Sequence, residues 1–335
     1  MQDNIAQPVV VITGASAGVG RAAAREFAKN GYQVALLARS EAGLEGARQD
    51  VEALGGKALA IPVDVSDQKK VEAAAQQIED ELGLIDVWVN NAMQSVFSPF
   101  DQMTPEEFKY VVEVTFMGQV YGTMAALKRM KPRNRGTIIM VGSALAFRGI
   151  PLQSAYCASK HAVKGFFDSV RSELVHDNSD VQLTMVHLSA INTTQFNWVK
   201  SRLPKKGKPM GKVYQPEVAA RAIYSAANQN RRTIFVGSGP FQTALGNTFI
   251  PGMLDRLLAK TGYSGQQTDQ PEDPDRPDNL WEPINEDRGA HGSFDDKASE
   301  ESLELQVSTN RGMEAAVVAG TALGVAGLVY LIRNS

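Results

Sequence analysis

The sequence predicts a doubly wound α/β fold, in which a mainly parallel sheet of seven strands carries helices on both faces. Two observations support this fold class. Between residues 9 and 236, short runs rich in β-branched residues alternate with longer helical stretches, a pattern typical of crossover units that join parallel strands. A glycine-rich turn follows the first of these runs at once, as happens where a strand passes directly into a helix.

Glycines separate the expected elements. The helical stretches end at Gly31, at Gly55 with Gly56, and at Gly83, residues that tolerate the left-handed conformation closing a helix. Each of these glycines precedes the next apolar run. The glycines therefore lie at the boundaries between each expected helix and the strand that follows it. The seven expected strands are residues 9–13, 33–38, 58–63, 85–89, 137–141, 183–188 and 233–236.

The composition changes after the seventh strand. Residues 266–296 are so rich in Pro, Asp, Glu, Asn and Gly that irregular surface structure or a linker is expected there. Residues 315–332 carry no charge and, as a helix, would reach about 27 Å against a bilayer core of ~30 Å. This segment is either a membrane span or a soluble helix that docks or forms oligomers. The chain thus divides into a main domain at 1–240, a partly irregular or linker-like extension at 241–311 and a terminal hydrophobic helix at 312–335.

The gross composition excludes several classes of protein. A formal charge of −3 and a pI near 5.9 provide no field that would concentrate nucleic acid. The single cysteine, Cys157, cannot close an intrachain disulfide, which fits a reducing compartment. The first apolar run is too short for a signal-peptide core, so the main domain is expected in the cytoplasm, with a possible C-terminal membrane anchor.

No metal site is expected. The four histidines show no ligand-like spacing with one another or with Cys157; they are His161, His176, His187 and His291. A small buried thiol is the favoured interpretation of Cys157, because helical alternation points it away from its neighbour Tyr156.

The glycine-rich turn predicts a dinucleotide site of the Rossmann type. Its glycines permit a tight turn and a close backbone approach to a pyrophosphate, and the following helix, residues 21–30, offers unpaired N–H donors and partial positive charge. The residues of the turn are Gly14, Ala15, Ser16, Ala17, Gly18, Val19 and Gly20.

The end of the second expected strand favours NADP(H) over NAD(H). An acidic side chain there would bind the ribose 2′-hydroxyl and repel a 2′-phosphate. The chain instead reads Ala38, Arg39 and Ser40, and the guanidinium of Arg39 suits a forked contact with phosphate. Ser16 could assist that contact.

Three residues form a candidate catalytic set. Tyr156 and Lys160 are four residues apart, so they share one face of the expected helix. A phenol has a pKa of ~10, and a fixed cation ~4 Å away provides up to about the 4 kcal/mol needed to bring it near neutrality. Ser143 follows the fifth strand, where its hydroxyl can orient a substrate carbonyl.

These motifs, in this order over about the first 240 residues, resemble the short-chain dehydrogenase/reductase family. The resemblance implies that Tyr156 gives or takes the proton, that Lys160 lowers its pKa and holds the nicotinamide ribose, and that Ser143 binds the reacting oxygen. It also implies a substrate flap near 193–213 and a homo-oligomer. The cofactor-binding residues it implies are Gly14, Ser16, Gly18, Val19, Gly20, Arg39, Asp64, Val65, Asn91, Tyr156, Lys160 and Thr194.

Two departures bear on turnover. Met93 stands where relatives usually have a glycine, after Asn91 and Ala92. Thr115 stands where many relatives carry an asparagine that anchors a water near the lysine, and a threonine offers fewer hydrogen bonds. Thr115 is therefore counted with the catalytic residues. The proton relay through this position is expected to be slower than with asparagine, or to follow another route.

The sequence thus predicts an NADP-dependent oxidoreductase that moves a hydride between nicotinamide and a carbonyl or alcohol substrate. The first alternative is a catalytically weak NADP-binding sensor or a membrane-associated scaffold. A sugar-nucleotide epimerase is disfavoured, because no substantial substrate domain follows the seventh strand. The flap leaves two interpretations open. Its lysines could attract an acidic substrate or carrier, or could face solvent, and Phe196 and Trp198 could contact an apolar substrate. These lysines are Lys205, Lys206, Lys208 and Lys212.

Overall fold

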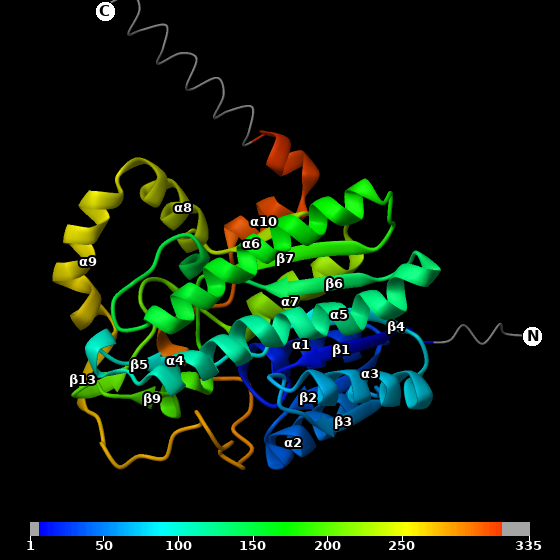
Figure 1. The fold of residues 1–335 in the computed structure, drawn as a ribbon, viewed down its shortest axis with the longest axis horizontal. Helices are drawn as coiled ribbons and strands as arrows, with labels where there is room; N and C mark the ends of the chain where they lie inside the picture. Colours follow the sequence, from blue (N-terminus) through cyan, green and yellow to red (C-terminus); the bar gives the residue numbers. More distant parts are fainter. Residues whose placement is uncertain (1–6, 317–335) are drawn as a thin grey trace, which may run out of the picture.

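The computed structural model describes residues 7–316, and its centre is a seven-stranded parallel sheet with the strand order β12-β7-β6-β4-β1-β2-β3 (Figure 1). Each neighbouring pair runs parallel. The order reverses direction at β1, because β2 and β3 extend to one side and β4, β6, β7 and β12 to the other. The predicted doubly wound fold is confirmed. The strands of this sheet are β1 (Val9–Thr13), β2 (Gln33–Ala38), β3 (Ala58–Pro62), β4 (Ile85–Asn90), β6 (Thr137–Val141), β7 (Gln182–Leu188) and β12 (Thr233–Val236).

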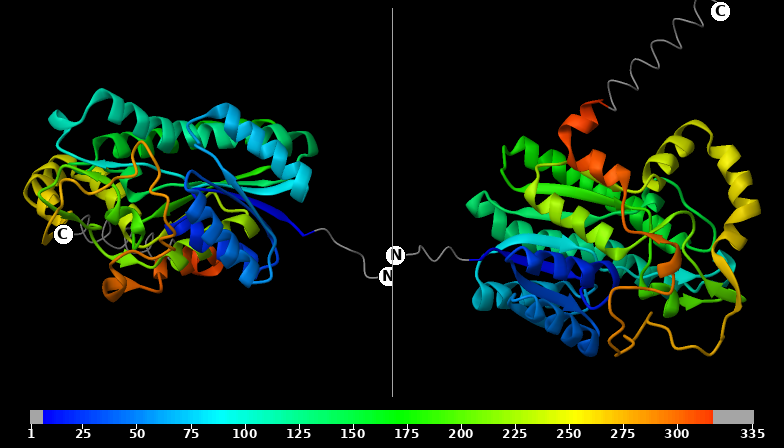
Figure 2. Two further views of the ribbon diagram at one scale, coloured as in Figure 1. Left: turned by 90° about the horizontal axis from the view of Figure 1, so that it is seen from below. Right: turned by 180° about the vertical axis from the view of Figure 1, so that it is seen from behind.

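Helices cover both faces of this sheet (Figure 2). The central strand β1 shows why: Val9 and Val11 pack into one buried cluster, while Val10 and Ile12 pack into the other. Side chains alternate along a strand, so a continuous apolar run fits only a sheet buried on both sides. One face packs against α1 (Gly18–Lys29), α2 (Glu41–Ala53) and α7 (Pro216–Asn228), and the other against α3 (Gln68–Leu82), α5 (Gly118–Met130) and α6 (Ser154–His176).

Several short elements surround the carboxyl ends of the strands. The segment after β4 contains β5 (Val96–Phe97), α4 (Pro105–Val112) and one turn of π-helix, Glu113–Met117, that leads into α5. Strand β8 (Ala190–Ile191) precedes the predicted flap, residues 193–213. The flap contributes β9 (Lys200–Ser201) and β10 (Lys205–Gly207), and β11 (Val213–Tyr214) begins at its last residue.

The chain after β12 first forms two helices, α8 (Gly239–Phe249) and α9 (Pro251–Gly265), which project beside the main sheet (Figure 1). Strand β13 (Gln267–Pro271) then pairs antiparallel with β10 of the flap. The chain returns through a long irregular stretch and one turn of 3-10 helix, Asp295–Lys297, to β14 (Ala298–Ser299), which pairs with β11. It then forms α10 (Leu303–Thr309). The extension therefore wraps around the flap and the main sheet.

The expected terminal hydrophobic helix, residues 312–335 with its apolar stretch at 315–332, lies outside the described residues except at its start. Within residues 7–316, the structure contains no helix with the length and apolar character needed to span a membrane.

Candidate functional site

A cavity of about 850 Å³ opens at the carboxyl ends of the parallel strands, the usual ligand position in doubly wound folds. Most of the residues singled out in the sequence converge on it from β1, β2, β4, β6, α6 and the flap. Two do not line it: Gly20 and Thr115. The residues that do are Gly14, Ser16, Gly18, Val19, Arg39, Asp64, Val65, Asn91, Ser143, Tyr156, Lys160 and Thr194.

The glycine-rich turn is built so that only glycine fits at its contact points. Gly14 has a φ of 68°, a left-handed conformation that side chains disfavour. A methyl group at Gly20 would lie 2.1 Å from the carbonyl oxygen of Gly14. Gly20 therefore serves the packing of α1 against the turn, beneath the cavity wall.

Asn91 braces this turn from the neighbouring strand. Its Nδ2 donates to the carbonyl oxygens of Thr13 at 3.0 Å and Gly14 at 3.3 Å. The backbone N–H groups of Asn91 and Ala92 donate to the Thr13 hydroxyl at 2.9 and 3.1 Å. These bonds tie the end of β4 to the end of β1, so the cradle is held rigid without a ligand.

The candidate catalytic residues lie together at one end of the cavity. Ser143 follows β6, and Tyr156 and Lys160 occupy the first turns of α6. The Lys160 Nζ lies 5.5 Å from the centre of the Tyr156 ring and donates to the carbonyl oxygen of Val141 at 2.8 Å. Ser143 lines the cavity beside Tyr156, and its hydroxyl accepts from the Leu145 N–H at 3.1 Å.

Burial sets the protonation of this group. It raises the pKa of Tyr156 well above its usual value, and the neighbouring Ser143 side chain opposes the rise only in part. It also lowers the pKa of Lys160 to about 7. Each shift disfavours the charged form in a medium of low polarity. In the structure, the phenol is therefore the protonated partner at neutral pH, and Lys160 is the group that titrates there.

Thr115 lies in the π-helical turn, fully buried. Its hydroxyl donates to the carbonyl oxygen of Gln94 and accepts from the Gln94 N–H, both at 2.9 Å. These contacts join the turn after β4 to the helix that leads into α5. The hydroxyl thus faces the Gln94 backbone rather than the cavity.

Thr194 offers a free polar group to the cavity. It is buried, and its Oγ1 has no hydrogen-bond partner among residues 7–316. Buried hydroxyls without a partner are uncommon in folded proteins. Together with the cradle at Gly14 and Gly20, this atom indicates that the residues present fit a bound dinucleotide.

A hydrogen-bonded chain at the other end of the cavity was not foreseen from the sequence. The Tyr110 hydroxyl donates to Asp64 Oδ2 at 2.7 Å and accepts from Arg39 at 3.0 Å. Burial raises the pKa of Asp64, but the hydrogen bonds from Ser66 and Tyr110 outweigh burial and lower it. Burial and the bond to Asp64 raise the pKa of Tyr110 to about 12. The aromatic residue at position 110 carried no motif that could have identified it.

Arg39 lines the cavity, but much of its guanidinium is engaged within the chain. Its Nη1 donates to the carbonyl oxygens of Leu280 and Trp281, each at 3.0 Å, and its Nη2 donates to that of Asn279. These acceptors belong to the C-terminal extension, about 240 residues away in the sequence. The Arg39 guanidinium, which was expected to bind a phosphate, is therefore already hydrogen-bonded to neutral backbone oxygens.

The rest of the cavity is mainly apolar. Leu254, Leu257 and Leu258 line it from α9, and Met93 lines it after β4. Trp198 and Phe196 of the flap also line it, and Phe196 packs in a cluster with Phe97 and Phe294. Of the flap lysines, Lys208 and Lys212 reach the cavity wall.

Comparisons with known proteins agree with this geometry. The short chain dehydrogenase family model matches residues 8–203. The chain is 34% identical over 276 residues to the uncharacterised oxidoreductase YxnA of Bacillus subtilis, covering 82% of this chain and 78% of that protein. It is 33% identical over 236 residues to the 3-dehydrosphinganine reductase of Danio rerio, covering 68% of this chain and 70% of that protein.

Solved structures give the same result. An alcohol dehydrogenase from the archaeon Thermococcus sibiricus, complexed with 5-hydroxy-NADP, superposes with a TM-score of 0.59 at 28% identity, covering 69% of this chain and 96% of that one. A metagenomic short-chain oxidoreductase in complex with NADP also has a TM-score of 0.59, at 26% identity and 68% and 96% coverage. The family model spans more than half of the chain, and the motifs it rests on line one cavity. The protein therefore belongs to the short-chain dehydrogenase family and is an NAD(P)-dependent oxidoreductase.

Proposed function

We propose that this protein is an NADP(H)-dependent reductase of apolar carbonyl compounds, with Tyr156 as the proton donor. The observation that carries the proposal is the convergence of Ser143, Tyr156 and Lys160 on a cavity that also contains the glycine-rich turn. Isolated Tyr and Lys pairs four residues apart occur by chance on helices, whereas this one faces a buried cradle suited to a dinucleotide.

The roles follow from the position of each group. Bound nicotinamide supplies or accepts the hydride. Ser143 donates a hydrogen bond to the substrate oxygen and orients it, and Tyr156 gives its phenolic proton to that oxygen as it becomes an alcohol. Lys160 places a positive charge behind the phenol and stabilises the phenolate left after proton transfer. Burial keeps the Tyr156 phenol protonated at neutral pH, which is the form that a proton donor requires.

The preference for NADP(H) rests on the end of β2. Ala38 carries no carboxylate to bind a 2′-hydroxyl, and Arg39 places a positive charge beside the cavity. Its contacts to the extension are with neutral oxygens, and the Tyr110 hydroxyl lies between it and the Asp64 carboxylate, so no carboxylate pairs with it directly within residues 7–316. The two structural neighbours were solved with NADP or an NADP derivative, which agrees with this preference.

The substrate class rests on the walls beyond Tyr156. Three leucines of α9 line the cavity, together with Trp198 and Met210 of the flap. Such a surface gains affinity from apolar groups in proportion to the area they bury. We therefore expect catalytic efficiency with NADPH to rise along a series of ketones as their alkyl chains lengthen.

The test is carbonyl-dependent oxidation of NADPH, followed with both nicotinamides and a graded series of ketones and aldehydes. Tyr156→Phe is expected to abolish turnover while NADPH still binds, as measured by calorimetry. Tyr224→Phe is the matched control, because this half-buried tyrosine packs on Phe27, on the face of the sheet away from Tyr156. Turnover that persists in Tyr156→Phe would refute the assigned mechanism.

A second candidate is a weakly active NADP-binding sensor. It is favoured by Thr115, whose hydroxyl is committed to the Gln94 backbone and so offers little to a proton relay. The same assay separates the two: a wild-type protein that binds NADPH tightly but reduces no carbonyl in the series supports the sensor.

A further inference from the structure

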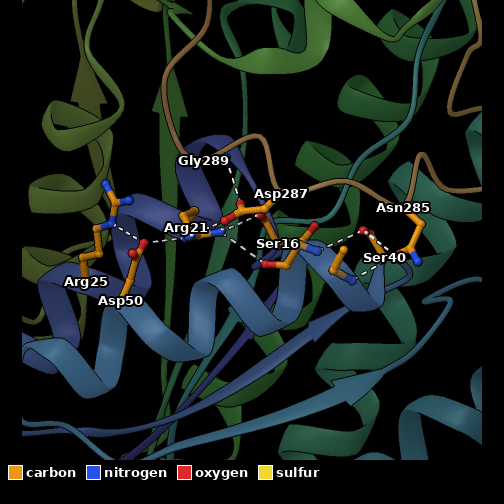
Figure 3. Close-up of polar contacts among 10 residues, drawn as sticks. Ser16, Arg21, Arg25, Ser40, Asp50, Asn285, Asp287 and Gly289 are labelled. Carbon is orange, nitrogen blue, oxygen red and sulfur yellow. Dashed lines mark hydrogen bonds and ion pairs between the residues drawn. The ribbon is translucent and has the colours of Figure 1, made fainter.

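A segment of the extension, residues 279–290, crosses the edge of the dinucleotide site; we call it the strap (Figure 3). It is anchored at both ends by buried residues. Leu280 packs in an apolar cluster with Val96 and Val111, and Ala290 belongs to the core on the α1 face of the sheet. Most of the middle of the strap is exposed, including Asn285, Glu286 and Asp287. Fixed ends and an exposed middle suit a segment that opens locally without unfolding the core.

The middle of the strap is held to α1 by a buried arginine. Arg21 is 3% exposed, and its Nη1 donates to Asp287 Oδ1 at 2.8 Å while its Nε pairs with Asp50. The Gly18 N–H of the glycine-rich turn donates to the carbonyl oxygen of Gly289 at 3.1 Å. The strap is thus bound directly to the turn that cradles the pyrophosphate (Figure 3).

Helix α2 leaves room for this contact. A methyl group at Gly46 would lie 2.1 Å from Asp287 Oδ2, so a larger residue there would push the carboxylate away from Arg21. At the first turn of the same helix, Asn285 Oδ1 accepts from the Ala42 N–H at 2.9 Å and lies 3.3 Å from the Ser40 Oγ. The Asn285 amide oxygen therefore occupies one N–H donor and one hydroxyl at a helix start, where an anion would otherwise be attracted.

The strap also forms part of the cavity wall. Asn279, Pro283 and Ile284 line the cavity, as do Arg39 and Ser40 at the end of β2. In doubly wound folds the end of the second strand receives the adenosine ribose. The strap therefore lies over the nucleotide half of the site, away from the catalytic group on α6.

We propose that the strap is a clamp that retains the nicotinamide nucleotide, and that the Arg21 to Asp287 contact is its latch. The inference rests on the proposed function only in that a dinucleotide must occupy this cavity. Entry and release of the nucleotide require the strap to open, and opening breaks the latch, the Gly18 to Gly289 hydrogen bond and the Asn285 contacts. Arg21 and Asp287 are positioning residues, since they act on the nucleotide through the strap.

The test measures release of NADPH by stopped-flow fluorescence, after displacement with excess NADP⁺. Asp287→Asn removes the charge of the latch, and Gly46→Ala displaces the carboxylate without altering any charge. Both are expected to speed release by about tenfold, the factor that corresponds to losing one charge-assisted hydrogen bond. Asp275→Asn is the matched control, because this exposed carboxylate lies in the extension before the strap, and its release rate should equal that of the wild type.

A second readout separates clamping from general damage. In single-turnover experiments with NADPH already bound, the rate of hydride transfer in both variants should stay within about twofold of the wild type, since the catalytic group is untouched. Release that is unchanged in both variants overturns the clamp and leaves the proposed function intact. A wild-type protein that binds no nicotinamide nucleotide overturns both.

Discussion

Replacing Lys160 with methionine is expected to stabilise the fold while it abolishes catalysis. Lys160 is 1% exposed, and burial lowers its pKa from the usual 10.5 to about 7. Below pH 7 the folded protein therefore contains a buried charge. At about 1.36 kcal/mol per pKa unit, the cost is on the order of 5 kcal/mol, and water penetration in solution reduces it to a few kcal/mol.

Methionine removes that cost with little loss of packing. Its unbranched side chain is similar in length to the lysine stem. The carbonyl oxygen of Val141, which accepts from Lys160, also accepts from Gln119 Nε2 at 3.2 Å, so it keeps a partner. The free energy of unfolding of Lys160→Met should therefore exceed that of the wild type by a few kcal/mol at and below neutral pH.

The pH dependence distinguishes this cause from a hydrophobic gain. Lys160 has a lower pKa folded than unfolded, so between about pH 7 and 10.5 the unfolded chain binds more protons and wild-type stability rises with pH. The advantage of Lys160→Met should shrink across that window. His187 acts only below this window, because burial lowers its pKa from 6.5 to about 3. Burial raises the pKa of Cys157 from 9.0 to about 11, so above about pH 9 this thiol lowers the stability of the wild type and of Lys160→Met alike, and the difference between the two proteins still reports Lys160.

The assay is urea unfolding followed by circular dichroism at several pH values from about 6 to about 10. Lys29→Met, at an exposed position on α1, is the matched control and should show no comparable trend. The reasoning is refuted if Lys160→Met is less stable than the wild type at neutral pH, or if its advantage is the same across the whole range.

Three further predictions concern the cofactor site. Ala38→Asp should place a carboxylate at the ribose and shift the ratio of catalytic efficiencies toward NADH by about tenfold or more; an unchanged ratio in steady-state kinetics would contradict the assignment of β2. Asn285→Asp should raise the dissociation constant for NADPH more than that for NADH, because it sets a negative charge near Ser40 and Arg39; equal effects in calorimetry would place the 2′-phosphate elsewhere. Gly20→Ala should lower the free energy of unfolding by about 1–3 kcal/mol and weaken nucleotide binding, because its methyl group would meet the Gly14 carbonyl oxygen. Gly165→Ala is the control, because Gly165 is exposed in α6 with open space around it. This variant should instead raise the free energy of unfolding by about 0.5–1 kcal/mol.

Local patterns predicted the sheet and most of the cavity. The continuous apolar run 9–12, followed by Thr13, predicted a strand buried on both faces, and it is β1. The turn from Gly14 to Gly20 and the pair Tyr156 and Lys160 lie at strand ends and helix starts. Their geometry depends on neighbours a few residues away, and this is why spacing alone located them.

The environment of these residues was decided by contacts between distant segments. The fork of Arg39 looked free for a phosphate, but carbonyl groups of residues 279–281 surround it. Thr115 was counted with the catalytic residues as a replacement that offers fewer hydrogen bonds than an asparagine, and the structure binds its hydroxyl to the Gln94 backbone. The pKa of Tyr156 was expected to fall beside a lysine, but burial raises it, because desolvation depends on everything packed around the ring.

The sequence by itself thus located the candidate functional groups in their order along the chain. These are a glycine-rich turn suited to a pyrophosphate, an end of β2 without a carboxylate, and a phenol four residues from an ammonium. Only the tertiary structure decided what lies against them. The polar composition of residues 266–296 indicated irregular structure, and it contained no sign that Asp287 would reach Arg21, 266 residues earlier. The periodic spacing of apolar residues in helices and strands indicates which face of each element is buried. The strap has no regular structure and is held by individual contacts, so the sequence shows no repeating pattern that could predict them.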